Sequence, residues 1–238
     1  MRRVALVTGA TSGIGLACAQ LFARAEWDVV TVARRTAPAS PGVALFGDVT
    51  DPLTSRRAVA TAIEHFGRLD AVVGNAGVTL AKSVDDTTDV ELEHLIAVNV
   101  KALVYLAQAA HSALAEARGS LVVMASNKGL VGQPGSPVYV ATKGAAVQLA
   151  RALALDWAPE GIRVNALCPG LVDTPMLRAF ADAQPDPDEA RRRLAVEQPL
   201  GRLARPDECA QAVLFLASPA ASFISGVALP LDGGFTAQ

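Results

Sequence analysis

The sequence predicts an α/β fold with a single domain, in which a doubly wound parallel sheet of about seven strands has helices on both faces. Short apolar runs alternate with longer helical segments along all 238 residues, and nothing marks a linker, so we expect one domain over residues 1–238. The expected strands cover residues 4–7, 28–32, 43–46, 71–74, 121–124, 163–167 and 227–231. Ligands of such sheets bind at the carboxyl ends of the strands, which is where we look for a site.

Composition excludes several functional classes. Hydrophobic residues make up 51% of the chain and charged residues 18%, which allows a large core and argues against disorder. Lys and Arg number 21 against 23 Asp and Glu, so no basic surface indicates a nucleic-acid partner. Cys18, Cys168 and Cys209 are scattered without metal-ligand spacing, so we expect buried thiols, no metal site and a cytoplasmic, reducing location.

The sequence gives no sign of membrane insertion. The apolar run that follows Met1 is too short for a signal peptide and leads directly into a glycine-rich turn. The longest apolar stretch, residues 140–158, contains Lys143, Arg151 and Asp156. These charges argue against a bilayer-spanning helix, so we expect no leader and no membrane partner.

A glycine-rich turn follows the first strand and opens a helix. Residues 8–15 read Thr-Gly-Ala-Thr-Ser-Gly-Ile-Gly, with the spacing Gly-x-x-x-Gly-x-Gly. Glycines let a backbone approach a phosphate closely, and a helix N-terminus offers unpaired N–H groups to it. The turn therefore favours a dinucleotide phosphate site, although a tight turn without a ligand stays open.

Two arginines follow the second strand. In a dinucleotide-binding sheet an acidic residue here accepts from the ribose 2′-OH, whereas an arginine suits a 2′-phosphate. Arg34 and Arg35 stand at this point and no acid does, which favours NADP(H) over NAD(H). Arginine pairs are also common on solvated loops, so NAD(H) remains open. The connection over residues 36–42 is short and Pro-rich, with little room for a crossover helix.

Three further features are candidate parts of a binding site, and two of them also have a purely structural interpretation. Asp48, after the third strand, could accept from an adenine amino group or cap a turn. After the fourth strand, residues 75–77 form a small-residue turn against which a flat ligand could lie. Asn99 falls within the apolar stripe of a helix around residues 90–114, so its amide either binds neighbouring backbone or organises the site.

The segment 120–143 carries the strongest candidate for chemistry. Ser126 follows the fifth strand, and Tyr139 and Lys143, four residues apart, share one face of the next helix. A hydroxyl, a phenol and an ammonium directed to one pocket are what proton transfer to a carbonyl or alcohol oxygen needs. This helix is apolar nearly all round, which predicts a subunit contact and a homo-oligomer, either a dimer or a homotetramer.

Residues 175–205 form a polar, Pro-containing segment rich in arginine. Such a segment is typical of a substrate lid or a specificity segment. A solvated pair of surface helices is the other interpretation, in particular for the run from Arg191 to Arg193.

These motifs, in this order, resemble the short-chain dehydrogenase/reductase family over nearly the whole chain. The matching positions are the turn from Thr8 to Gly15, Asn75-Ala76-Gly77, Asn99, Ser126, Tyr139-x-x-x-Lys143 and Pro169-Gly170. The chain departs from the family at Gly74, Ala125, Asn127 and Lys128, and Lys128 could alter the mouth of the pocket.

The resemblance implies a Rossmann-like fold and hydride transfer between C4 of a nicotinamide and a carbonyl or alcohol carbon. Tyr139 would be the acid or base, and Lys143 would favour its phenolate and bind the nicotinamide ribose. Ser126 would hold the substrate oxygen, and Asn99 would support a proton path through water. The implied cofactor-binding residues are Gly9, Ser12, Gly13, Ile14, Gly15, Arg34, Asp48, Val49, Asn75, Ala76, Gly77, Tyr139, Lys143, Pro169, Gly170, Val172 and Thr174.

The substrate stays open at this stage. Family frequency favours a 3-oxoacyl thioester, and a sugar or polyol or a small cyclic alcohol or ketone are alternatives. A regulator that binds a dinucleotide without chemistry is the remaining hypothesis.

Overall fold

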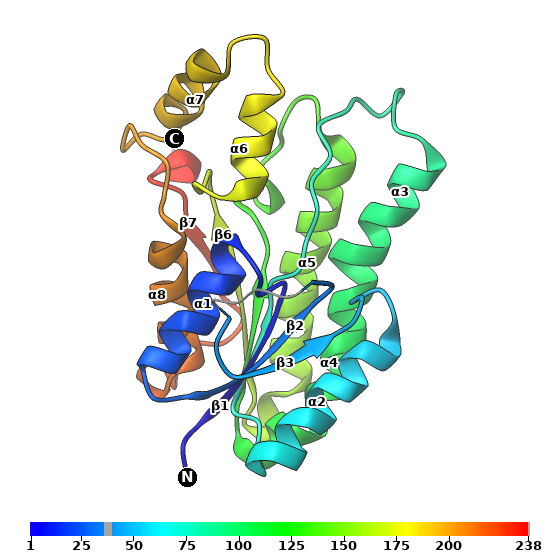
Figure 1. Ribbon diagram of the computed structural model, residues 1–238, viewed down its shortest axis with the longest axis vertical. Helices are drawn as coiled ribbons and strands as arrows, with labels where there is room; N and C mark the ends of the chain where they lie inside the picture. The colour runs from blue at the N-terminus through cyan, green and yellow to red at the C-terminus, as the bar shows by residue number, and fades with distance from the viewer. Residues whose placement is uncertain (36–39, 238) are drawn as a thin grey trace.

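The computed structural model describes residues 1–35 and 40–237, so most of the Pro-rich connection expected over residues 36–42 lies outside the described residues. In the described part, seven strands form one parallel sheet in the order β3-β2-β1-β4-β5-β6-β7 (Figure 1). The strands are β1 (Val4–Thr8), β2 (Asp28–Ala33), β3 (Val43–Phe46), β4 (Ala71–Gly74), β5 (Ser120–Met124), β6 (Arg163–Pro169) and β7 (Ala228–Leu231). The predicted fold class is confirmed.

Helices connect these strands. They are α1 (Gly13–Arg24), α2 (Pro52–Phe66), α3 (Asp89–Ile96), α4 (Ala102–Ala117), α5 (Pro137–Asp156), α6 (Pro175–Asp182), α7 (Pro187–Val196) and α8 (Pro206–Ala217). The single helix expected around residues 90–114 is instead α3 and α4 joined by a π-helical turn, Ala97–Lys101. Among the described residues, no helix is both long enough and apolar enough to cross a membrane.

The two faces of the sheet carry separate helix layers. Successive side chains of a strand point to opposite faces. In β1, Val4 and Leu6 therefore pack with α2, α4 and α5, whereas Ala5 and Val7 pack with α1 and α8 (Figure 1). Both layers are apolar, so the sheet lies in the middle of the core and only the strand ends reach polar surroundings.

The strand order reverses direction at β1, which pairs with β2 on one side and with β4 on the other. Connections that run in opposite directions from neighbouring strands leave a crevice at their carboxyl ends. The loops that follow β1 and β4 meet there: a Cβ atom placed on Gly9 would lie 3.0 Å from the Cα of Ala76. Helices α6 and α7 lie beyond the same end of the sheet, at the top of Figure 1.

Candidate active site

The glycine turn after β1 is held by the loop after β4. Gly9 has a φ of 68°, a conformation that glycine adopts without strain. The side-chain amide of Asn75 donates to the carbonyl oxygens of Thr8 and Gly9, at 2.9 and 3.3 Å. Gly15 packs so closely against Asn75 that a Cβ there would collide with the amide. Asn75 thus fixes the turn that was predicted to bind the cofactor phosphates.

Thr8 contributes a contact that the sequence analysis did not assign. Its Oγ1 accepts from the backbone N–H groups of Asn75 and Ala76, at 3.0 and 3.1 Å. A threonine directly before the glycine turn was the available signal. Through it, the first strand end positions the small-residue turn that includes Ala76 and Gly77.

The first turn of α1 is open to an anion. Ser12, the N-cap residue, is exposed and makes no side-chain capping bond, and the first turn, which includes Gly13, Ile14 and Gly15, contains no acidic residue. A Cβ on Gly13 would lie 3.2 Å from Cγ2 of Thr174, so the segment after β6 borders this turn. An uncapped helix N-terminus beside a glycine turn fits a dinucleotide phosphate.

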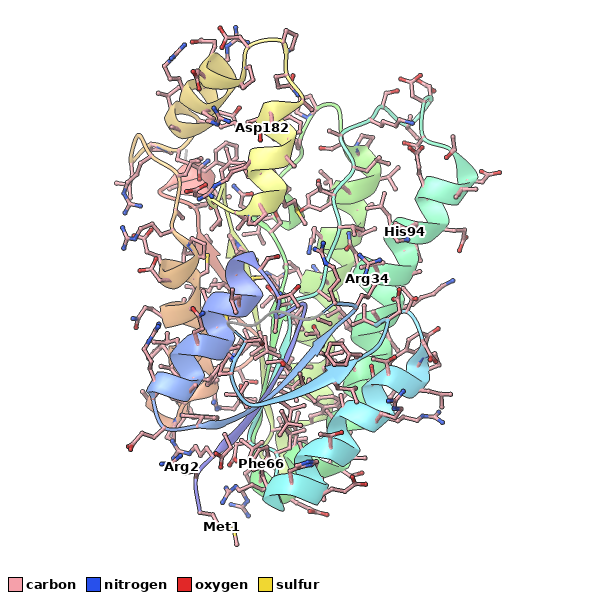
Figure 2. All side chains as sticks on the ribbon, viewed as in Figure 1. Met1, Arg2, Arg34, Phe66, His94 and Asp182 are labelled. Carbon is pink, nitrogen blue, oxygen red and sulfur yellow. The ribbon has the colours of Figure 1, made fainter. Side chains whose placement is uncertain are left out.

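Arg34 lies exposed just past the end of β2 (Figure 2). Among the described residues, no carboxylate lies within 4.0 Å of its guanidinium. Asp48 caps its own turn, because its Oδ1 accepts from N and Oγ1 of Thr50 at 2.9 and 2.8 Å. These bonds lower the pKa of Asp48, with smaller contributions from Arg34 and His94. Val49, next in the chain, packs against the core.

Ser126, Tyr139 and Lys143 come together as predicted. β5 ends at Met124, and Ser126 follows it, while α5 carries Tyr139 and Lys143. The Lys143 Nζ, almost fully buried, donates to the carbonyl oxygen of Met124 at 3.0 Å and lies 5.9 Å from the centroid of the Tyr139 ring. The Ser126 hydroxyl lies close enough to the Tyr139 phenol to act on its pKa.

The titration of these groups differs from the sequence expectation. Burial raises the pKa of Tyr139, and the nearby Ser126 hydroxyl only partly offsets this. Burial also lowers the pKa of Lys143 to about 8. The expected lowering of the Tyr139 pKa by Lys143 is therefore corrected: desolvation outweighs the neighbouring cation, whose Nζ is bound to the Met124 carbonyl. In the chain alone, Tyr139 is a protonated phenol at neutral pH.

Asn99 lies in the π-helical turn and is almost fully buried. Its Oδ1 accepts from the N–H of Val78 at 2.9 Å, and its Nδ2 donates to the Val78 carbonyl at 2.9 Å and to Oγ1 of Thr142 at 3.1 Å. The amide thus binds neighbouring backbone, which is one of the two interpretations offered from the sequence, and it also reaches Thr142, the residue before Lys143. That Asn99 organises the site stays a prediction. π-Helical turns occur frequently at functional sites.

Gly77 lies beside these groups. A Cβ at this position would lie 3.4 Å from both Oδ1 of Asn99 and Nζ of Lys143. The turn after β4 is thus next to an ammonium and, through Asn75, next to the glycine turn after β1. Hydrogen-bonding groups and an ammonium at the carboxyl ends of the strands suit the ribose and ring of a nicotinamide nucleotide, so the residues present fit the implied cofactor.

A family model described as Enoyl-(Acyl carrier protein) reductase matches residues 9–236. The chain belongs to the short-chain dehydrogenase/reductase family. It is thus an oxidoreductase that transfers a hydride between a nicotinamide cofactor and an alcohol or carbonyl substrate.

Relatives of this short-chain dehydrogenase are similar over nearly their full length. The meso-2,3-butanediol dehydrogenase of Serratia marcescens is 36% identical over 99% of this chain and 95% of its own. The cyclopentanol dehydrogenase of Comamonas testosteroni is 38% identical over 99% and 98% of the two chains. The cis-4-hydroxycyclohexanecarboxylate dehydrogenase of Sinomonas cyclohexanicum is 38% identical over 99% and 97%.

A solved structure supports the same relationship. The ligand-free aldohexose dehydrogenase of Thermoplasma acidophilum superposes with a TM-score of 0.95 at 30% identity, covering 100% of this chain and 95% of that chain. The whole chain of this short-chain dehydrogenase, including residues 175–205, therefore follows a known architecture.

The segment after β6 begins beside the cofactor residues. β6 ends at Pro169, and the N–H of Gly170 donates to the Leu231 carbonyl at 3.0 Å. Val172 then pairs with Ala204, which ties the start of the predicted lid to its end. Two predicted cofactor residues on this segment are thus held in place, Gly170 by β7 and Val172 by Ala204.

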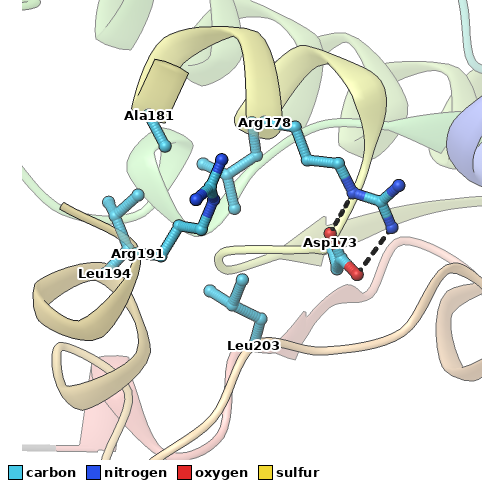
Figure 3. A pocket seen from close by; sticks show the side chains of 7 residues that line it. Asp173, Arg178, Ala181, Arg191, Leu194 and Leu203 are labelled. Carbon is cyan, nitrogen blue, oxygen red and sulfur yellow. Dashed lines mark hydrogen bonds and ion pairs between the residues drawn. The ribbon is translucent and has the colours of Figure 1, made fainter. Parts of the chain in front are cut away.

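The predicted lid consists of α6 and α7. Arg191 forms ion pairs with Asp182 and Asp188, and Arg192 and Arg193 both pair with Glu189. The arginine run therefore follows the solvated-helix interpretation. Between the two helices is a cavity of about 280 Å³ whose apolar wall includes Leu177, Leu194 and Leu203 (Figure 3). The residues that line it do not include the catalytic candidates.

The remaining predicted features concern thiols and metals. Cys18, Cys168 and Cys209 are all buried and free. Within residues 1–35 and 40–237, no group of three or more His, Cys, Asp or Glu side chains could hold a metal ion. The thiols are therefore core residues in this structure.

Proposed function

We propose that this short-chain dehydrogenase oxidises a small secondary alcohol, cyclic or polyol, to its ketone with NADP⁺ and catalyses the reverse reduction with NADPH. The observation that carries the proposal is the group formed by Ser126, Tyr139 and Lys143 beside Gly77. Each of these side chains has a separate task in the reaction.

A bound nicotinamide supplies or accepts the hydride at its C4. Tyr139 gives the proton to the developing alkoxide in reduction and removes it from the alcohol in oxidation. Ser126 holds the substrate oxygen by a hydrogen bond, and its position next to Tyr139 lets both hydroxyl groups reach the same oxygen. Lys143 supplies positive charge near the phenol and binds the ribose hydroxyl groups. Asn99 supports proton exchange with solvent and holds the strand-end loop at Val78.

The preference for NADP(H) rests on Arg34. Its guanidinium is exposed and has no ion-pair partner among the described residues. The Asp48 carboxylate nearby is already engaged in its own turn through Thr50. A 2′-phosphate would supply the missing anion to Arg34, whereas a 2′-hydroxyl would not.

The proposed substrate class follows the relatives more closely than family frequency. The printed names of three similar enzymes refer to meso-2,3-butanediol, cyclopentanol and cis-4-hydroxycyclohexanecarboxylate. All three are compact secondary alcohols. They therefore favour a polyol or a cyclic alcohol over the 3-oxoacyl thioester, which family frequency alone favoured.

A substrate panel tests the proposal. Short diols, cyclic alcohols, their ketones, sugars and a 3-oxoacyl thioester are offered with each of NADP(H) and NAD(H), and nicotinamide absorbance is followed. We expect turnover of a cyclic alcohol or diol with NADP⁺. Tight cofactor binding without turnover of any compound would instead support a regulator that binds a dinucleotide without chemistry.

We also propose that α5 forms a contact between subunits of a homo-oligomer, a dimer or a homotetramer. Ala141, Ala145 and Leu155 lie exposed on this helix, and Leu155 is 78% exposed. An exposed apolar helix face marks a candidate contact between proteins. Light scattering should give a mass of two or four chains for the native protein and a lower one for Leu155→Asp. A native mass of one chain would exclude the contact.

A cytoplasmic location completes the proposal. It rests on the three buried thiols Cys18, Cys168 and Cys209, none of which forms a disulfide. Fractionation of the source cells should recover the protein with cytoplasmic markers, and its recovery in an extracytoplasmic fraction would overturn this part.

A further inference from the structure

Lys128 is one of the positions where the chain departs from its family, and it is fixed to the catalytic serine. Its backbone N–H donates to Oγ of Ser126 at 3.2 Å, and both belong to the short 3₁₀ turn Asn127–Gly129 with Ser126 as its N-cap. A Cβ on Gly129 would lie 2.6 Å from the carbonyl oxygen of Lys143, so the turn packs tightly against α5. The position of Lys128 is therefore set by the catalytic residues.

The ammonium of Lys128 is partly buried and has no anionic partner. It lies 3.9 Å from the centroid of the Phe235 ring, and burial lowers its pKa. Among the described residues, no carboxylate lies within 4.0 Å of it. An aromatic face recovers only part of the solvation that a desolvated cation loses. A partly desolvated ammonium without a counter-ion is suited to binding one.

The two carboxylates that act on Lys128 from neighbouring elements are otherwise occupied or solvated. Asp232 accepts through its two oxygens from the N–H groups of Gly234 and Thr236, at 3.1 and 3.0 Å. Glu197, at the end of α7, is exposed to solvent. Both influence Lys128 electrostatically without forming an ion pair with it.

Asn127 adds a second donor without an acceptor. It is 1% exposed, and its Oδ1 accepts from the Ser126 hydroxyl at 3.4 Å. Its Nδ2 has no hydrogen-bond partner in the described part of the chain. Leaving a buried donor unpaired is unfavourable, because its bond to water is lost without replacement. Two donors within two residues of Ser126 thus lack acceptors.

We propose that Lys128, assisted by Nδ2 of Asn127, binds a carboxylate carried by the alcohol or ketone substrate. A carboxylate offers two acceptor oxygens and a full negative charge, which are what an unpaired ammonium and an unpaired amide donor lack here. The inference rests on the proposed function and narrows its substrate class to hydroxy acids and keto acids whose carboxylate is separate from the reacting carbon.

A purely structural role for Lys128 makes a different prediction. If the ammonium only held the turn at Phe235, its loss would affect neutral and anionic substrates alike, and loss of the ring would have the same effect. If it binds the substrate carboxylate, the charge matters for anionic substrates and the ring matters little.

The test compares 4-hydroxycyclohexanecarboxylate with cyclohexanol, which differ by the carboxylate. The ratio of their kcat/KM values is measured for the native enzyme, Lys128→Met, Lys128→Arg and Phe235→Leu. We expect the native enzyme to prefer the carboxylate. Lys128→Met should lower the ratio roughly tenfold or more, since hydrogen bonds to charged groups are worth about 1.5–3 kcal/mol. Lys128→Arg and Phe235→Leu should retain most of the native preference, measured as the same kcat/KM ratio.

An unchanged ratio in Lys128→Met, or a native preference for cyclohexanol, would overturn the proposal. Absence of turnover of both compounds would count against the proposed function, and calorimetry then decides the question for Lys128 separately. Cyclohexanecarboxylate should bind the native enzyme with NADPH and fail to bind Lys128→Met. Equal binding by the two proteins, or none by the native enzyme, would overturn the role of Lys128.

Discussion

The side-chain amide of Asn99 donates to the hydroxyl of Thr142 across 3.1 Å, and that hydroxyl donates in turn to the carbonyl oxygen of Tyr139 at 2.8 Å. A buried chain of hydrogen bonds therefore joins the π-helical turn between α3 and α4 to the helix that carries the proposed acid. Because Lys143 directly follows Thr142, both functional groups of α5 depend on this bracing.

Replacement of Asn99 by Ala should lower kcat by about tenfold or more, because the loss of its hydrogen bonds frees α5 and the Val78 loop. Steady-state kinetics with a preferred alcohol measures this, and a melting curve verifies folding. Thr142→Ser keeps the hydroxyl and serves as the matched control, with kcat near the native value. Native kcat in Asn99→Ala would show that the bracing is dispensable.

The sequence predicted which residues form the candidate site, but not all of the contacts between the segments that carry them. Ser126, Tyr139 and Lys143 could be predicted because a strand end and a four-residue helical repeat place them. The bond from Asn99 to Thr142 spans 43 residues, and no local pattern predicts such a contact. The direction of the Tyr139 pKa shift could not be predicted either, since it depends on burial in the folded chain.

Arg34→Ala should weaken NADPH binding by roughly ten- to one-hundredfold and leave NADH binding nearly unchanged. The reason is that only NADPH carries the 2′-phosphate, and hydrogen bonds to charged groups are worth about 1.5–3 kcal/mol. Fluorescence titration of both nucleotides measures the effect. Arg24→Ala, at the far end of α1 from the phosphate turn, is the control. Native NADH affinity that equals or exceeds NADPH affinity would refute the preference.

The rate of ketone reduction should fall as the pH rises through about 8. Burial lowers the pKa of Lys143 to about 8, so its positive charge is present below this pH and is lost above it. Tyr139 keeps its proton over the same range, because burial raises its pKa. Initial rates and circular dichroism at each pH separate this loss from unfolding. The residual rate of Lys143→Met should lack the decline, and a constant native rate to about pH 10 would contradict the assignment.

Asp70 should stabilise the fold at the opposite end of the sheet from the site. Its Oδ2 accepts from the N–H of Val4 at 2.8 Å, and its carboxylate pairs with Arg68. Asp70→Ala should cost about 2 kcal/mol, because it leaves a buried N–H unpaired. For a domain of this size, that corresponds to a Tm about 4–8 °C lower. Asp85→Ala, on an exposed loop, is the control and should melt like the native protein.

A Tm of Asp70→Ala equal to the native value would mean that water or Arg68 replaces the lost contact. The melting curves need to be reversible for the comparison, because only then does Tm report the free energy of unfolding.

The fold was predictable where apolar runs and turn residues coincide. The bounds of β3 and β4 match the expected residues 43–46 and 71–74. The division of the helix around residues 90–114 was not predictable, because its apolar stripe continues through the π-helical turn.

Tyr139→Phe tests the central claim most directly. The protein has two tyrosines, so Tyr105→Phe on α4 is a matched control. We predict that Tyr139→Phe lowers kcat by about 10²–10⁴-fold while NADPH binds as in the native enzyme, because the variant lacks only the transferable proton. Tyr105→Phe should turn over normally. Full turnover by Tyr139→Phe would contradict the assignment of the phenol as the catalytic acid and base.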